Sequence, residues 1–183
     1  SNIRNAAIVR ILLTTGMRSI ELVRADIEDI EYREGTYILH YQGKGKTSKN
    51  NFKVLDDRTV EEINIYLRER FGVNSVSSIP KSDIPTPLLV GHSNRNKGRL
   101  NTKTIRSDVK KLLLLCGIDN KKISTHSLRH TLGTIIFEVT GDTNKTAAAL
   151  GHTDGSKHTH KYVKAAKDKR RIEESIDISE LLD

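Results

Sequence analysis

Residues 15–22 read Thr-Gly-Met-Arg-Ser-Ile-Glu-Leu, and this stretch separates two predicted helices. Before it, Ile3 to Thr15 carries apolar side chains at helical spacing. Gly16 then ends the first helix, and Ser19 to Arg24 predicts a second, short one. Arg18 lies just past the break, where two roles are open: binding an anion, or capping the carbonyls at the end of the first helix.

Downstream of this stretch, three segments alternate β-branched or aromatic residues with polar ones, which predicts three antiparallel strands. They are Ile27 to Tyr32, Thr36 to Tyr41 and Asn51 to Leu55. The sequence Gly-Lys-Gly-Lys-Thr-Ser at residues 43–48 connects the last two. Lys44 is therefore expected at the end of a strand or at the tip of a hairpin.

Most of the remaining chain has the apolar spacing of helices. The predicted fold is therefore α+β and mainly α, a helical body with a small three-stranded antiparallel sheet, formed by residues 1–183 as a single domain. The segment from Gly72 to Pro87 holds all three prolines and is expected to be a loop. The predicted helices of this part are Asp56 to Arg70, Asn101 to Cys116, Ser127 to Thr140 and Thr143 to Leu150.

The composition indicates a globular protein with a polyanionic partner. Charged residues make up 30% of the chain and the formal charge is +8, which favours nucleic acid without proving it. Basic residues gather in residues 40–55, 95–111 and 157–171, and ordinary solvated faces are the alternative for each. No apolar run approaches the roughly 20 residues of a membrane helix. The single cysteine, Cys116, is expected to pack as a small buried side chain.

Two short motifs add candidate phosphate-binding residues. His126 and Arg129 are three residues apart at the start of a helix, so both can face one cleft, and a helix N-terminus favours phosphate. His152 follows a helix stop at Leu150-Gly151. The alternatives are an ordinary helix start capped by Thr125 and a histidine favoured by the dipole of a helix C-terminus.

Tyr162 is the one tyrosine in a basic, polar segment, beside a predicted helix at Thr159 to Ala165. Two arginines, a lysine, two histidines and a tyrosine suffice for phosphodiester transfer without a metal. The arginines can neutralise the phosphate oxygens, the lysine can protonate a leaving alcohol and the tyrosine can attack phosphorus. The histidines also raise the alternative of a metal site, but their spacing fits no zinc pattern.

Together these segments strongly resemble the catalytic domain of the tyrosine recombinases, the phage integrase family. The family motif Thr-Gly-x-Arg-x-x-Glu-Leu matches residues 15–22 at every fixed position, and Gly-Lys-Gly, His-x-x-Arg and Leu-Gly-His follow in the family's order. The resemblance implies the DNA breaking–rejoining fold and site-specific recombination of DNA, without a cofactor or a metal. The catalytic residues that it implies are Arg18, Lys44, His126, Arg129, His152 and Tyr162.

The resemblance also implies a role for each of these residues. Tyr162 would attack the scissile phosphate, giving a 3′-phosphotyrosyl bond and a free 5′-hydroxyl, while the arginines and histidines stabilise the phosphorane. Lys44 would protonate the leaving oxygen, although Lys46 and Lys49 are close enough in sequence to compete. Tyr162 follows the Leu-Gly-His histidine by ten residues instead of the family's usual nine, which a longer loop would absorb. Glu21 would orient Arg18, and His130 would be structural.

An organisation larger than this chain is implied too. The chain is expected to be the C-terminal catalytic domain of a longer integrase, without its N-terminal DNA-binding domains. The expected partners are double-stranded DNA and further copies in a homotetramer on paired DNA sites, with a monomer when free and no membrane. Residues 166–183 are expected to pack on a neighbouring protomer, because their end is acidic and carries an apolar stripe, and folding back onto the same domain is the alternative. The expected location is the cytoplasm, associated with the nucleoid, and the expected origin is a phage or another mobile element.

Three other functions remain open from the sequence. A type IB topoisomerase relaxes DNA with the same set of residues. A non-catalytic DNA-binding module could retain the fold alone. A metal-dependent nuclease would need clustered carboxylates, and the sequence places none near the histidines.

Overall fold

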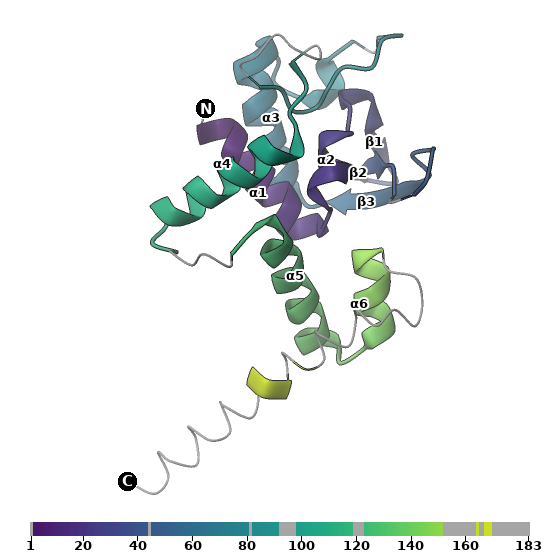
Figure 1. Cartoon of the computed structure of the whole chain (residues 1–183). Helices are drawn as coiled ribbons and strands as arrows, with labels where there is room; N and C mark the ends of the chain where they lie inside the picture. The colour runs from purple at the N-terminus through teal and green to yellow at the C-terminus, as the bar shows by residue number, and fades with distance from the viewer. Residues whose placement is uncertain are drawn as a thin grey trace, which may run out of the picture.

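The computed structural model describes residues 2–43, 45–80, 82–91, 98–118, 123–151, 164 and 167–169. Within them, the chain forms a mainly helical body with a three-stranded antiparallel sheet, which confirms the predicted fold class (Figure 1). The elements, with η for 3₁₀ turns, are α1 (Asn2–Thr15), α2 (Ser19–Val23), η1 (Ile27–Asp29), β1 (Ile30–Arg33), β2 (Thr36–Tyr41), β3 (Asn51–Leu55), α3 (Asp57–Phe71), η2 (Val76–Ser78), α4 (Thr102–Leu115), α5 (Thr125–Thr140) and α6 (Thr143–Leu150).

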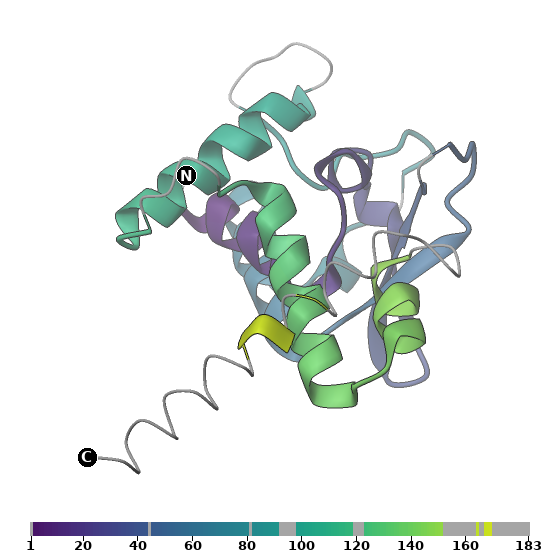
Figure 2. The same cartoon turned by 60° about the horizontal axis from the view of Figure 1, so that its bottom comes forward.

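Helix α1 forms the centre of the core. Its apolar residues Ala7, Ile8, Ile11 and Leu12 are buried, and the helix contacts α3, α4, α5 and β3. A buried ion pair joins it to α4, since the Arg4 guanidinium lies 2.7 Å from the Asp108 carboxylate. Helices α5 and α6 form a hairpin below this core (Figures 1 and 2). Among the described residues, no helix has both the length and the apolar character needed to cross a membrane.

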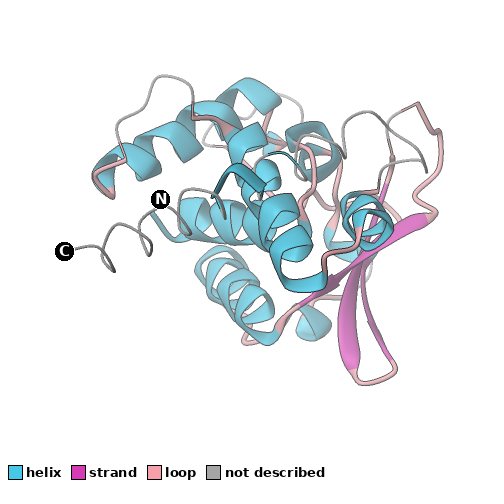
Figure 3. Cartoon of the chain, turned by 90° about the horizontal axis from the view of Figure 1, so that it is seen from below, coloured by secondary structure: helices cyan, strands magenta, loops and turns pink. Residues whose placement is uncertain are grey.

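The sheet lies at one edge of the helical body, with strand order β1-β2-β3 (Figure 3). In the β2–β3 register Tyr37 lies opposite Leu55 and Tyr41 opposite Asn51. The prediction of a strand beginning at Ile27 was wrong, because η1 occupies residues 27–29. The Asp29 carboxylate accepts a 2.7 Å hydrogen bond from the Asp26 backbone N–H, which closes this turn before β1 starts.

The helix ends follow capping chemistry that can be read from the sequence. The side chains of Asp56, Asn101 and Asp142 accept hydrogen bonds from the first turns of α3, α4 and α6. At α5 the cap is Ser124 instead of the expected Thr125, so the helix starts two residues earlier than predicted. His126 consequently lies within the first turn of α5.

The expectation that Cys116 is buried was wrong, because its side chain is exposed. The preceding leucines suggest a buried helix face, but α4 ends beyond the core, and Leu115 just before the cysteine is 78% exposed. An apolar run at the end of a helix therefore says little about burial when the partner helix, here α1, does not extend as far (Figure 1).

Asp56 provides a test of how α1 and α3 are joined. Its carboxylate accepts hydrogen bonds of 3.1 Å from the Thr59 backbone N–H and 3.0 Å from Arg10 of α1. Burial alone would raise the pKa of Asp56, but hydrogen bonds from Thr59 and Arg10 outweigh it and lower the pKa to about 2. We expect Asp56→Ala to lower the free energy of unfolding by about 1 kcal/mol at pH 7 in urea titrations, the usual effect of losing an N-cap.

The sign of the pH dependence follows from the lowered pKa. The stabilisation by Asp56 is present above pH 4 and is lost as the pH falls toward 2, so the difference between Asp56→Ala and the wild type should shrink over that range. The control is Asp57→Ala, which removes the neighbouring exposed carboxylate from the first turn of α3. An equal loss in the control would contradict the capping role of Asp56.

Candidate active site

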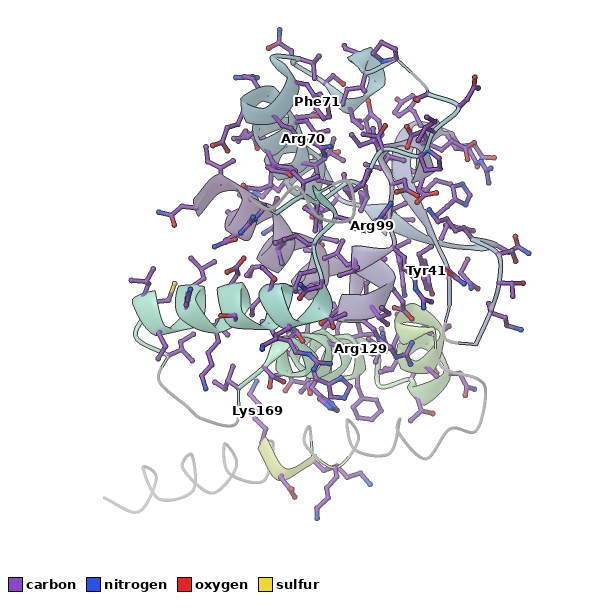
Figure 4. The ribbon with its side chains drawn as sticks, turned by 45° about the horizontal axis from the view of Figure 1, so that its top comes forward. Tyr41, Arg70, Phe71, Arg99, Arg129 and Lys169 are labelled. Atoms are coloured by element: carbon purple, nitrogen blue, oxygen red, sulfur yellow. The ribbon has the colours of Figure 1, made fainter. Side chains whose placement is uncertain are left out.

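Arg129 lies where α1, α5 and α6 meet, and it is only 2% exposed (Figure 4). Its guanidinium donates one hydrogen bond to the Gly16 carbonyl at the end of α1 and another to the Leu150 carbonyl at the end of α6. Gly16 has a φ of +63°, a conformation that favours glycine. One arginine thus fixes the relative positions of two segments that the sequence singled out.

Arg18 precedes α2 in an extended conformation and is held by Glu21. Its guanidinium lies 2.7 Å from one Glu21 carboxylate oxygen, and its backbone N–H donates a 2.7 Å hydrogen bond to the other. The Glu21 side chain is almost fully buried, whereas that of Arg18 is 31% exposed. The contact predicted between Glu21 and Arg18 is therefore present, and Arg18 does not cap α1.

A pocket of about 560 Å³ brings Arg18, His126 and Arg129 together. Its floor joins α2 to the first turn of α5, where the hydroxyls of Ser19 and Thr125 are 2.8 Å apart. Because three arginines and the N-terminal turn of α5 line the pocket, it suits an anion. Its lining residues are Met17, Arg18, Ser19, Ile20, Arg106, Ser124, Thr125, His126 and Arg129.

No functional prediction came from the sequence for two residues at this site, one that lines the pocket and one that contacts a lining residue. Arg106, on the exposed side of α4, lines the pocket although it belongs to no short motif. His130 contacts His126 edge-on, with ring centroids 4.5 Å apart. The spacing of four residues on α5 already places these two rings on the same helix face.

The buried position of Lys53 could not be predicted from the charge pattern. This lysine belongs to the basic stretch of residues 40–55, yet its ammonium is mostly buried and donates a hydrogen bond to the Ala149 carbonyl of α6. Burial, followed by the charge of Arg129, lowers the pKa of Lys53 to about 8. The signal was the two-residue period of β3, which places Lys53 on the same face as buried Leu55.

Lys49 is taken up by an ion cluster away from the pocket. Its ammonium lies 2.6 Å from the Asp26 carboxylate and also contacts Asp29. Arg99 donates to Asp26 from the other side. Burial would raise the pKa of Asp26, but Lys49 and Arg99 outweigh it and hold the pKa below its usual value. Of the hairpin lysines named as alternatives to Lys44, only Lys46 is exposed within the described residues.

Lys44, His152 and Tyr162 lie outside the described residues, so their places stay predictions. The structure does describe one residue before His152 and one after Tyr162 that are each held in place. Gly151 ends α6, and beyond Tyr162 the Lys169 ammonium lies 3.1 Å from the Glu138 carboxylate of α5 (Figure 4). Among the residues that the structure does describe, no group of three or more His, Cys, Asp or Glu side chains could hold a metal ion.

Comparison with known proteins gives consistent matches. The model of the phage integrase family matches residues 1–169. The tyrosine recombinase XerC of Syntrophus aciditrophicus is 29% identical over 160 residues, covering 87% of this chain and 48% of that protein. The tyrosine recombinase XerD of Vibrio cholerae is 28% identical over 152 residues, covering 83% of this chain and 46% of that protein. The chain thus spans about half the length of these relatives.

Solved structures show the same fold. The crystal structure of XerA recombinase is 29% identical with a TM-score of 0.68, covering 94% of this chain and 57% of that chain. The XerH site-specific recombinase, in a post-cleavage complex with a palindromic difH substrate, is 26% identical with a TM-score of 0.70, covering 97% of this chain and 46% of that one.

Proposed function

The chain belongs to the phage integrase family, and from this premise we propose that it is the catalytic part of a tyrosine site-specific recombinase acting on double-stranded DNA. The observation that carries the proposal is the pocket in which Arg18, His126 and Arg129 converge at the N-terminus of α5. Three cationic or hydrogen-bonding groups at a helix N-terminus match the charge of a phosphodiester and of its pentavalent transition state.

The two arginines differ in how they are held, which suits different contributions. Arg129 is fixed by two carbonyls and Arg18 by one carboxylate, so both guanidiniums are oriented before DNA binds. Preorganised donors of this kind stabilise charge that develops in the transition state, and losing one typically costs about 10²–10³ in rate. His126, in the first turn of α5, would donate a further hydrogen bond to one of the two non-bridging phosphate oxygens.

The covalent steps are assigned to residues of the same family motifs. The Tyr162 oxygen attacks phosphorus and releases its proton to water, the bond from phosphorus to the 5′ oxygen breaks, and Lys44 gives that oxygen a proton. The 5′-hydroxyl of a partner strand then attacks the phosphotyrosine, and the same steps run in reverse. His152 is assigned a further hydrogen bond to the phosphorane. Because each phosphodiester bond broken is replaced by another, no ATP is consumed.

The DNA surface would continue from the pocket onto α4. Lys103, Arg106 and Lys110 recur at helical spacing and are exposed, whereas Asp108 is buried against Arg4. This arrangement leaves a basic stripe beside the pocket that can contact phosphates on either side of the scissile one. The relatives named above are recombinases, which favours strand exchange over simple relaxation as the outcome. A homotetramer on paired DNA sites, a cytoplasmic location and a mobile-element origin belong to the same proposal.

A covalent-capture experiment tests the proposal. The chain is incubated with a pool of duplexes that carry a randomised segment and a nick just downstream of it, so that cleavage releases a short fragment that carries the free 5′-hydroxyl. We expect SDS-resistant protein–DNA adducts that form equally well with EDTA, and sequencing the captured strands gives the preferred duplex. Adducts that vanish with EDTA, or cleaved DNA without adducts, would show a metal-dependent nuclease instead.

Binding to the selected duplex should weaken steeply with salt. With 6–10 phosphate contacts, affinity is expected to fall roughly 10³- to 10⁵-fold between 50 and 200 mM salt. Fluorescence anisotropy at several salt concentrations measures the slope, and sedimentation of the complex reports how many protomers it contains. A nearly flat plot of log affinity against log salt concentration would contradict the basic surface.

A further inference from the structure

The C-terminal turn of α6 is held by two cationic side chains from other elements. The last carbonyl groups of a helix have no partner within it. Here the Ala149 carbonyl accepts from Lys53 of β3, the Leu150 carbonyl accepts from Arg129 of α5, and the Gly151 N–H bonds back to the Ala148 carbonyl at 2.9 Å. We call the pair of bonds from Lys53 and Arg129 the α6 clamp.

The sheet supports this turn at a second point. The Lys53 ammonium lies 5.9 Å from the centroid of the Tyr41 ring in the neighbouring strand. A Cβ atom added to Gly151 would lie 2.9 Å from the Tyr41 hydroxyl, so Gly151 packs directly on that side chain. In the sequence, His152 directly follows Gly151.

We propose that Lys53 is a positioning residue, whose ammonium fixes the end of α6 and thereby the point at which the chain enters His152. Arg129 holds the adjacent carbonyl, so two cations from different elements hold the same turn. The test by DNA capture rests on the proposed function. The test by NMR of His152 does not.

The charges around the Lys53 ammonium show how its substitution should affect stability. Four ionisable groups face the ammonium: Arg129 of α5, Arg18 and Glu21 beside and within α2, and Tyr41 of β2. Burial and the two arginines lower the pKa of Lys53 to about 8, and Glu21 opposes them only in part. Burial of the ammonium disfavours the folded state, so replacing Lys53 by an apolar side chain removes this cost and loses the hydrogen bond to Ala149, two effects of opposite sign on stability.

The direction of the pH effects follows from the same shift. Between about pH 8 and the ordinary lysine value of 10.5, the folded chain binds fewer protons than the unfolded chain, so this group makes stability rise with pH. The hydrogen bond to Ala149 weakens over the same range, because a charged donor forms a stronger bond than a neutral one. Stability and positioning therefore change in opposite directions above pH 8.

Two variants of Lys53 and one control test the proposal. Lys53→Met keeps the length of the side chain without its charge, Lys53→Arg keeps a charge at all accessible pH values, and Lys145→Met removes an exposed lysine from the same helix. Capture is timed on the selected duplex with a 5′-bridging phosphorothiolate, whose leaving group needs no proton, so that the hairpin lysine does not influence the pH profile.

We expect Lys53→Met to melt close to the temperature of the wild type, because the two effects on stability oppose each other, while its capture rate falls roughly 10- to 100-fold, the usual range when a residue that orients a functional group is removed. Lys53→Arg should recover part of the rate, and the ratio of wild-type to Lys53→Arg rates should fall above pH 8. Lys145→Met should match the wild type. A Lys53→Met rate equal to that of the wild type, or one that falls only together with the melting temperature, would overturn the proposal.

A measurement without DNA keeps this inference distinct from the proposed function. The imidazole C–H resonance of His152 is assigned by its loss in His152→Gln and is followed by NMR. It should shift in Lys53→Met and not in Lys145→Met, whether or not the chain captures DNA. An unchanged His152 resonance in Lys53→Met would overturn the positioning role, and absence of capture by the wild type would overturn only the proposed function.

Discussion

Tyr162→Phe is expected to abolish covalent capture of the selected duplex while leaving its affinity nearly unchanged. The substitution removes one oxygen, the atom that would attack phosphorus, and alters neither the basic surface nor the arginine pocket. Adducts are counted on SDS gels with the nicked duplex, and affinity is measured by anisotropy at the same salt concentration. Tyr32→Phe is the matched control, because Tyr32 lies exposed on β1, and it should capture DNA like the wild type.

Persistent adducts in Tyr162→Phe would show that another tyrosine attacks phosphorus. Tyr41 would then be the next candidate, because its hydroxyl lies against Gly151 near the pocket. Burial, and then Glu21, raise the pKa of Tyr41, which makes it a poorer nucleophile. A double variant lacking both hydroxyls would decide between them.

Arg129→Ala is expected to lower the capture rate by at least about 10², and a better leaving group should not restore it. It removes a guanidinium that stabilises charge on the non-bridging oxygens, which the 5′-bridging phosphorothiolate does not replace. Lys44→Ala is the contrasting variant: its defect is confined to protonation of the leaving oxygen, so the same substrate should restore its rate. The measurement compares capture on the oxygen and sulfur substrates for both variants.

Arg129→Ala also has a structural consequence that must be measured beside the rate. The buried carbonyls of Gly16 and Leu150 lose their partner, so we expect the free energy of unfolding to fall by at least about 2 kcal/mol. Rescue of Arg129→Ala by sulfur would refute its role in stabilising charge. Rescue of Lys46→Ala in place of Lys44→Ala would move the general acid two residues along the hairpin.

Local sequence patterns predicted those parts of the molecule that depend on near neighbours. The contact of Arg18 with Glu21 spans three residues, and the spacing of His126 and Arg129 on one helix turn brought both into the pocket. The strands from Thr36 to Tyr41 and from Asn51 to Leu55 were found at the predicted residues. In each of these cases the periodicity of a single element decides the result.

Contacts between distant segments could not be predicted in this way. Lys49 meets Asp26 across 23 residues, and Lys53 meets Ala149 across 96. A lysine in a basic stretch has the same local pattern whether it faces solvent, an ion cluster or a helix end, so only the packing of the sheet against α6 distinguishes them. The family resemblance names Arg129 as a catalytic residue, which stays a prediction, and it gives no indication of the hydrogen bonds to Gly16 and Leu150.

The glycine after α1 has a further consequence, for how this chain can change during evolution. A methyl group at position 16 would lie 2.8 Å from a Leu150 methyl and 3.0 Å from one of Leu132, in a backbone conformation that other residues rarely adopt. Position 35 also has a positive φ, but nothing lies within 4 Å of a Cβ there. Position 35 in the sheet turn can therefore change during evolution, for example to asparagine. Position 16, at the junction of α1, α5 and α6, must stay glycine.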